Sequence, residues 1–275
     1  MPVTLATNAY GKSRIRVVKV TRHAGRHDLV ELTVNVQFEG DFAAVHLSGD
    51  NRNVLPTDTM KNTVNAFAKA WSGEQIEEFG RQLAGHFLEG NPQVSRAHIE
   101  IAQSQWTRIS PSAFTRGSEE KRTTRISAAR DAVEIESGVE NLIVLKSAGS
   151  AFEGYKKDRY TTLKETSDRV FATAITANWT YRRPQVPFGP CWQQAREAIL
   201  TTFIERDSPS VQHTAYAMGH AVLQAVPDIS QVRLSLPNKH CLLIDLTPFG
   251  LDNANEIFVP TDEPHGLIEV SLQRT

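Results

Sequence analysis

The chain has 275 residues, of which 40% are apolar, so it can bury the core of one large domain or of two ordinary ones. Its 30 basic and 31 acidic residues leave a formal net charge of -1. This balance excludes the single-sign field with which proteins follow a nucleic-acid backbone. No apolar run is long enough to span a bilayer, and neither a signal peptide nor a Ser-Lys-Leu terminus is recognisable. We therefore expect a cytoplasmic protein whose two cysteines stay reduced, although one disulfide is arithmetically possible.

A hairpin is predicted near the start of the chain. From Val30 to Phe38 apolar residues occupy every second position, which is typical of a strand with one buried face. Residues 14–20, rich in valine and arginine, form the preceding strand. The polar stretch 23–27, with Gly25 at its centre, predicts the turn between the two strands.

The hydrophobic period then lengthens, and two amphipathic helices are predicted, broken near Ser72-Gly73. Their apolar stripes are Met60, Val64, Phe67 and Trp71 in the first helix and Ile76, Phe79, Leu83 and Phe87 in the second. Two further strands are expected at residues 97–109 and 123–135. The polar run 117–122 between them is expected to be a solvated loop.

The second half of the chain repeats this order of elements. The expected elements are strands at 141–147 and 169–181, helices at 191–204 and 211–222, and strands at 232–236, 242–246 and 267–272. A sequence echo between residues 57–63 and 160–166 also favours an internal repeat. We therefore predict an α+β fold with antiparallel sheets and helices on one face, divided into domains at residues 1–138 and 139–275.

Several short runs, taken together, carry a family resemblance. They are Tyr10-Gly11-Lys12, Thr57-Asp58-Thr59-Met60-Lys61-Asn62-Thr63, Asp158 to Thr166 followed by Asp168-Arg169, Ser210-Val211-Gln212, Leu236-Pro237-Asn238-Lys239-His240 and Pro264-His265-Gly266-Leu267-Ile268. In order and spacing they resemble the urate oxidase (uricase) family over essentially the whole chain. Each run is weak alone, but the set is specific.

The resemblance implies a fold, an activity and an assembly. The fold is a tandem of tunnelling-fold (T-fold) domains. Two subunits close a sixteen-stranded barrel, and two such dimers stack into a homotetramer with active sites at subunit interfaces. The activity is oxidation of urate by dioxygen and water to 5-hydroxyisourate and hydrogen peroxide in purine catabolism, with no cofactor and no metal. Closing a barrel across subunits would also remove the unpaired edges that an open antiparallel sheet exposes.

The resemblance assigns purine binding to Phe152, Arg169, Val211 and Gln212. Urate is flat and anionic, so a planar guanidinium fork suits its charged edge, and an amide side chain can both donate and accept there. An aromatic ring can stack on the purine face. Without the resemblance, Arg169 is equally a surface arginine at a strand end, and Phe152 is equally a core aromatic.

The resemblance places Thr57 and Asp58 of a neighbouring subunit at the five-membered ring of urate. Thr57 is expected to be the N-cap of its helix, and free amides behind such a cap make an anion site. The alternative is that Thr57 only caps the helix. Lys12 resembles the lysine that hydrogen-bonds to this threonine, although by itself it would be a mobile terminal charge.

His240 is the third member of the resembling proton relay with Lys12 and Thr57, although a lone histidine in a strand is more often structural. Asn238 resembles the asparagine that, with Thr57, holds dioxygen or water above the ring. Pro237 predicts a bulge or bend that would aim both side chains off the regular pleat.

Two rival functions stay open. One is a pterin enzyme of the same fold, which would generally use zinc, and the other is a purine-binding protein without activity. The sequence contains no Cys pair or His-Glu-x-x-His run for zinc and no Gly-x-Gly-x-x-Gly run for a dinucleotide. The chain departs from the family pattern at Ser167 and in the loop 153–155, which could alter substrate affinity.

Overall fold

The structure, a computed structural model, describes residues 2–275. Its first elements are β1 (Tyr10–His23), β2 (Arg26–Gly40), α1 (Ala43–Ser48), α2 (Thr57–Ala70), α3 (Ile76–Gly90), β3 (Val94–Ser104), β4 (Thr107–Arg108), β5 (Phe114–Thr115), β6 (Lys121–Ala128) and β7 (Val133–Lys146). They are followed by β8 (Phe171–Tyr181), α4 (Phe188–Glu205), α5 (Val211–Ala225), β9 (Ile229–Leu243), η1 (Thr247–Phe249) and β10 (Phe258–Gln273).

The chain forms two compact units. The first extends to Gly138 and also takes in Thr180–Gly189, and the second consists of Val139–Trp179 and Pro190–Thr275. The long strands β7 and β8 therefore contribute residues to both units. None of the described helices is long and apolar enough to cross a membrane.

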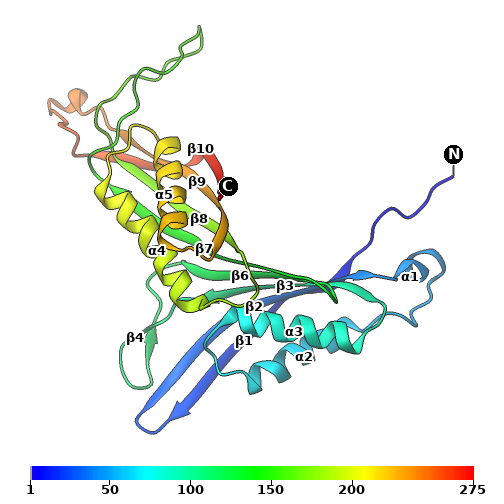
Figure 1. Cartoon of the computed structure of the whole chain (residues 1–275). Helices are drawn as coiled ribbons and strands as arrows, with labels where there is room; N and C mark the ends of the chain where they lie inside the picture. Colours follow the sequence, from blue (N-terminus) through cyan, green and yellow to red (C-terminus); the bar gives the residue numbers. More distant parts are fainter. Residues whose placement is uncertain (1) are drawn as a thin grey trace. The chain divides into compact units, whose positions relative to one another are not determined.

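The first unit is an antiparallel sheet with two helices on one face. Its strands run in the order β1, β2, β3, β6 and the first part of β7. The predicted hairpin is confirmed, with Gly25 in its turn at a φ of 82° that favours glycine. The side chains alternating along β2 from Leu32 to Phe38 are buried as expected. Helix α2 packs on β1, and α3 packs on β3 and β6 (Figure 1).

The second unit has the same plan. Strands β9 and β10 pair antiparallel, and α5 packs against both of them (Figure 1). The predicted stripes of the two helices are confirmed as buried, namely Trp192, Ala195, Ile199 and Phe203 in α4 and Val211, Ala215, Met218 and Val222 in α5. Two strands, two helices and two strands thus recur in each half.

A basic side chain caps the carboxyl end of all four long helices. In the first unit Lys19 donates to the carbonyls of Ala68 and Lys69 at the end of α2, and Arg130 donates to Leu88 near the end of α3. In the second unit Lys146 donates to Phe203 near the end of α4, and Arg274 donates to Leu223 and Val226 at the end of α5. A lysine before the first helix of each pair and an arginine after the second support internal duplication.

The prediction that residues 57–63 and 160–166 are equivalent parts of an internal repeat was wrong. Residues 57–63 form the first two turns of α2, whereas residues 160–166 form an irregular segment that precedes β8. The structural counterpart of α2 is α4. Both segments are polar and rich in threonine, but they fold differently.

Other boundaries also differ from expectation. Strand β6 begins at Lys121, and the neighbouring Arg122 is only 8% exposed, so the run 117–122 is not wholly a solvated loop. The guanidinium of Arg122 is buried because it donates to the carboxylate of fully buried Glu77 at 2.6 Å. Strand β7 continues through Asn141, whose φ of 57° bends it locally. Cys191 and Cys241 form no disulfide.

Candidate active site

Lys12 lies on β1 directly after Gly11, a position at which only glycine fits between the strands. Lys12 pairs with Val36 of β2 and is partly buried. A Cβ on the preceding Gly11 would lie 1.9 Å from the Val36 carbonyl oxygen, so only glycine allows the strands to approach this closely. Immediately after Lys12 the pairing register shifts before Ile15. The lysine therefore sits at the last regular pair before an irregularity.

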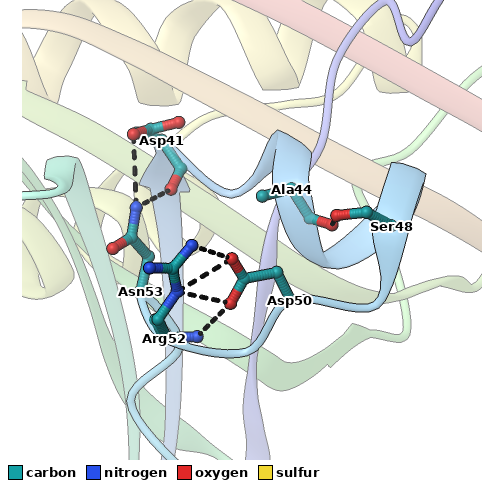
Figure 2. Close-up of polar contacts among 6 residues, drawn as sticks. All are labelled: Asp41, Ala44, Ser48, Asp50, Arg52 and Asn53. Carbon is teal, nitrogen blue, oxygen red and sulfur yellow. Dashed lines mark hydrogen bonds and ion pairs between the residues drawn. The ribbon is translucent and has the colours of Figure 1, made fainter.

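The loop that leads to Thr57 is tied down by polar side chains (Figure 2). Asn53 donates to the backbone and the carboxylate of Asp41 at 3.3 and 3.2 Å, and Arg52 pairs with Asp50. The side-chain amide of Gln93 donates to the carbonyl of Asn53 at 2.8 Å. These contacts give an irregular segment a defined path into helix α2.

Thr57 is the first residue of α2, and the expectation that it is the N-cap was wrong. Pro56 occupies the N-cap position with φ -55° and ψ 136°. Proline can start the helix because its missing N–H would have no partner there in any case. The Thr57 hydroxyl is therefore not needed as a cap, and the first-turn amides of α2 remain a potential anion site.

Asp58 connects this helix start to Lys12 electrostatically. A hydrogen bond from Lys61 and the charge of Lys61 lower the pKa of the Asp58 carboxyl most, and the amide of Asn62 and the charge of Lys12 contribute further. Lys12 is thus close enough to α2 for its charge to act on Asp58. The structure brings Lys12, Thr57 and Asp58 into one region of the first unit.

In the second unit, backbone bridges hold the segment that carries Phe152 and Arg169. The amide of Arg169 donates to the Ser150 carbonyl at 2.8 Å, and Phe152 forms an antiparallel bridge with Thr166. Ser150 also forms a parallel bridge with Ser208, just before helix α5. This ribbon links the aromatic ring, the guanidinium and the start of α5 without regular secondary structure.

The Arg169 side chain is partly buried without an ion-pair partner among residues 2–275. Its carbon Cζ lies 5.4 Å from the centroid of the Phe152 ring. Its Nε is buried and has no hydrogen-bond partner, and burial lowers the pKa of the guanidinium. A desolvated cation with unused donors beside an aromatic ring is suited to a planar anion.

Tyr155 backs the Phe152 ring. The two rings stack with centroids 4.8 Å apart and an interplanar angle of 13°. The Tyr155 hydroxyl donates to the Leu163 carbonyl at 2.5 Å, and this hydrogen bond fixes the Tyr155 ring. The loop 153–155, noted only as a departure from the family pattern, therefore positions the proposed stacking residue.

Val211 and Gln212 begin helix α5. Ser210 is its N-cap, and its hydroxyl accepts from the amide of His213 at 3.1 Å. Val211 is buried and anchors the helix start, whereas Gln212 is exposed and available to a ligand. The Ser208 hydroxyl accepts from Thr214 at 2.7 Å, so this helix start is fixed to the ribbon that holds Arg169.

Asn238 and His240 lie on β9 opposite an irregularity in its partner strand. Asn238 pairs with Gly266 and His240 with Thr261, so four residues of β10 stand opposite Lys239 alone. The irregularity expected after Pro237 is confirmed between Asn238 and His240, but its extra residues lie in β10, and Pro237 itself pairs regularly with Leu267. No hydrogen bond or ion pair in residues 2–275 links Asn238 or His240 to Phe152 or Arg169.

The nine predicted site residues thus fall into groups that the fold assembles locally. Lys12, Thr57 and Asp58 belong to the first unit. Phe152, Arg169, Val211, Gln212, Asn238 and His240 belong to the second. Sequence analysis missed Tyr155 and Ser210 as supporting residues, although the serine before an apolar helical stripe is a recognisable cap signal.

Two halves, each an antiparallel sheet with a helix pair on one face, define a tandem T-fold protein. The family model described as Uricase matches residues 8–127 and 135–269. The chain belongs to the uricase family.

Individual relatives agree. The uricase of Arthrobacter globiformis is 44% identical over 274 residues, which cover 99% of this chain and 90% of that protein. Its crystal structure has a TM-score of 0.96 and covers 100% of this chain and 96% of that chain. The uricase of Dictyostelium discoideum is 37% identical, and the alignment covers 99% of this chain and 98% of that protein. The urate oxidase of Bacillus sp. TB-90 shares the fold. It is 21% identical, and its crystal structure has a TM-score of 0.87 and covers 97% of this chain and 100% of that chain.

Proposed function

We propose that this chain is a urate oxidase, an oxidoreductase that uses dioxygen and water to convert urate to 5-hydroxyisourate and hydrogen peroxide without a cofactor. Its membership of the uricase family supports the reaction. The observation that carries the site is Arg169, a partly buried guanidinium with an unpartnered Nε beside the Phe152 ring. That pair matches a flat organic anion.

Binding is assigned to the second unit. Arg169 and Gln212 clamp the charged edge of urate, and Phe152, backed by Tyr155, stacks on its face. Val211 is buried at the start of α5 and anchors the helix end that carries Gln212. A urate held in this way is oriented and keeps its negative charge.

Proton transfer is assigned to Lys12, Thr57 and His240. The Lys12 amine, acting through the Thr57 hydroxyl, removes a further proton from urate, and His240 exchanges that proton with the amine or with water. The urate dianion gives two electrons to dioxygen held near Asn238 and Thr57. The resulting peroxide adduct takes up two protons, one returned by the Lys12–Thr57–His240 relay and one from water, and its C–O bond to the purine breaks to release hydrogen peroxide. This leaves dehydrourate, to which water adds to give 5-hydroxyisourate.

The assembly we propose is a homotetramer whose active sites combine Thr57 and Asp58 of one subunit with Arg169 and Gln212 of another. Strand β1 in the first unit and strand β10 in the second are edge strands. Long exposed edges favour pairing with another chain, and barrel closure would satisfy them. We expect the protein in the cytoplasm, where cysteines stay reduced.

The test is urate turnover by metal-stripped protein. The expected result is loss of the ultraviolet band of urate with one hydrogen peroxide formed per urate consumed. Activity that disappears on chelation and returns with a metal would refute the cofactor-free reaction. Binding of urate without peroxide formation would favour a purine-binding protein instead.

A further inference from the structure

Tyr10 joins the strand that carries Lys12 to the loop that carries Thr57. Its hydroxyl oxygen accepts a hydrogen bond from the backbone N–H of Leu55 at 2.9 Å, across 45 residues of sequence. Tyr10 precedes Lys12 by two residues, and Leu55 precedes Thr57 by two. This hydrogen bond therefore connects the backbone next to Lys12 with the backbone next to Thr57, the two residues assigned to proton transfer.

The Tyr10 ring is itself held firmly. It makes edge contacts with Phe38, at a centroid distance of 5.9 Å, and with Phe42, at 4.7 Å. Both phenylalanines are almost completely buried. Burial raises the pKa of the Tyr10 phenol, so the hydroxyl remains neutral at physiological pH. The acceptor is thus a partly buried hydroxyl whose ring is held against two core side chains.

The two connections from this crosslink to the site are stiff. On the strand side, Gly11 is pressed against the Val36 carbonyl, which fixes the backbone that leads to Lys12. On the helix side, Pro56 has its φ fixed by the ring at -55° and leads directly to Thr57. A displacement of Leu55 would therefore move the Thr57 hydroxyl relative to Lys12.

We propose that Tyr10 is a positioning residue for the Lys12–Thr57 pair, acting through its hydrogen bond to Leu55. This inference rests on the proposed urate oxidase activity. Tyr10 does not touch urate and takes no proton from it. It sets the distance across which the lysine and the threonine exchange one, and proton transfer is sensitive to misplacements of an ångström or less.

The experiment compares wild-type protein with Tyr10→Phe, which keeps the ring contacts and removes only the acceptor. We expect kcat to fall about tenfold because proton transfer is mispositioned. The affinity for urate, measured anaerobically so that no turnover occurs, is expected to stay within about twofold because the clamp residues are unchanged. The solvent deuterium isotope effect on kcat is expected to rise.

Two further variants make the result specific. Thr124→Val removes another hydroxyl-to-backbone hydrogen bond of the first unit, of 2.7 Å to Glu136, and is expected to lower the melting temperature while leaving kcat unchanged. Asn53→Ala loosens the same loop at an exposed contact and is expected to lower kcat less than Tyr10→Phe does. It reports on the loop even if Tyr10→Phe is poorly folded.

The outcomes separate the inference from the proposed function. An active wild type with an equally active, folded Tyr10→Phe would overturn the role of Tyr10 and leave the proposed function intact. A loss of kcat in Thr124→Val equal to that in Tyr10→Phe would reduce the effect to general destabilisation. A wild type that binds but does not oxidise urate would overturn both.

Discussion

The proposed binding role of Arg169 rests on the surroundings of single atoms in its guanidinium. A buried charge without a partner costs free energy, and proteins usually neutralise it. Here Nε is buried and unpartnered, while the strand bridges around Ser150 hold the backbone in place. A bound anion would offset the cost of this unpartnered donor.

Replacing Arg169 by lysine tests this interpretation. Lysine keeps the charge but loses the planar pair of donors, so we expect KM for urate to rise roughly tenfold or more with little change in melting temperature. Steady-state kinetics and thermal unfolding provide the measurements. Arg206→Lys, a change of the same type at an exposed position of the second unit, is the control. An unchanged KM would mean that Arg169 is a surface arginine without a role in urate binding.

Asp58 provides a pH prediction. Its pKa is lowered in the folded protein by Lys61 first, so it contributes stability above the pKa of the unfolded chain, near 3.8, and loses it as the pH falls through the folded value. We expect Asp58→Asn to melt below the wild type at pH 7. The difference should disappear in acid, below both pKa values. Asp252→Asn, also exposed, should show no difference at either pH.

At the scale of elements, helix ends explain why the two halves resemble each other. The last carbonyls of a helix lack intrahelical partners and carry partial negative charge, so a lysine or arginine from a neighbouring segment satisfies both needs. Lys19 and Lys146 do this for α2 and α4. The pattern repeats in space although the local sequences do not.

We expect Lys19→Met to lower the free energy of unfolding by about 1 kcal/mol, because it removes two charge-assisted contacts while keeping the aliphatic stem. Urea denaturation followed by circular dichroism measures this. Lys156→Met, at an exposed position, is the matched control. Equal stability of the two variants would mean that the Lys19 contacts contribute nothing measurable.

At the scale of the whole molecule, the question is whether one chain holds a complete site. Lys12, Thr57 and Asp58 belong to one unit, and the remaining site residues belong to the other. The proposed assembly takes these two groups from different subunits. That arrangement predicts a behaviour that no single-chain site can show.

Coexpression of Thr57→Ala with Arg169→Ala should restore activity, although each variant alone is inactive. Random pairing places half of the subunits in mixed dimers, and one of the two sites in such a dimer is intact, so about a quarter of wild-type activity is expected. Specific activity of the purified mixture provides the measurement. A mixture as inactive as its parents would show that the two groups act within one chain.

Much of the fold could be predicted from the sequence because its signals are local. The alternation along β2 from Leu32 to Phe38 and the helical stripes of α3, α4 and α5 follow from burying one face and are confirmed. In the stripe of α2, Met60 and Val64 are buried as predicted, whereas Phe67 is only half-buried. Boundaries were less predictable. Asn141 bends β7 without ending it, and Pro56 rather than Thr57 begins α2, because backbone geometry and neighbouring segments decide such positions.

The candidate site divides in the same way. The sequence by itself determined the residue types and their order, from Lys12 through Arg169 to His240, and with them the family. Only the tertiary structure decided that Tyr10 reaches Leu55, that Tyr155 stacks on Phe152, and that the irregularity opposite Asn238 lies in β10. Such contacts join residues that are distant or irregularly spaced along the chain. Their free energies depend on packing in three dimensions, which no local period encodes.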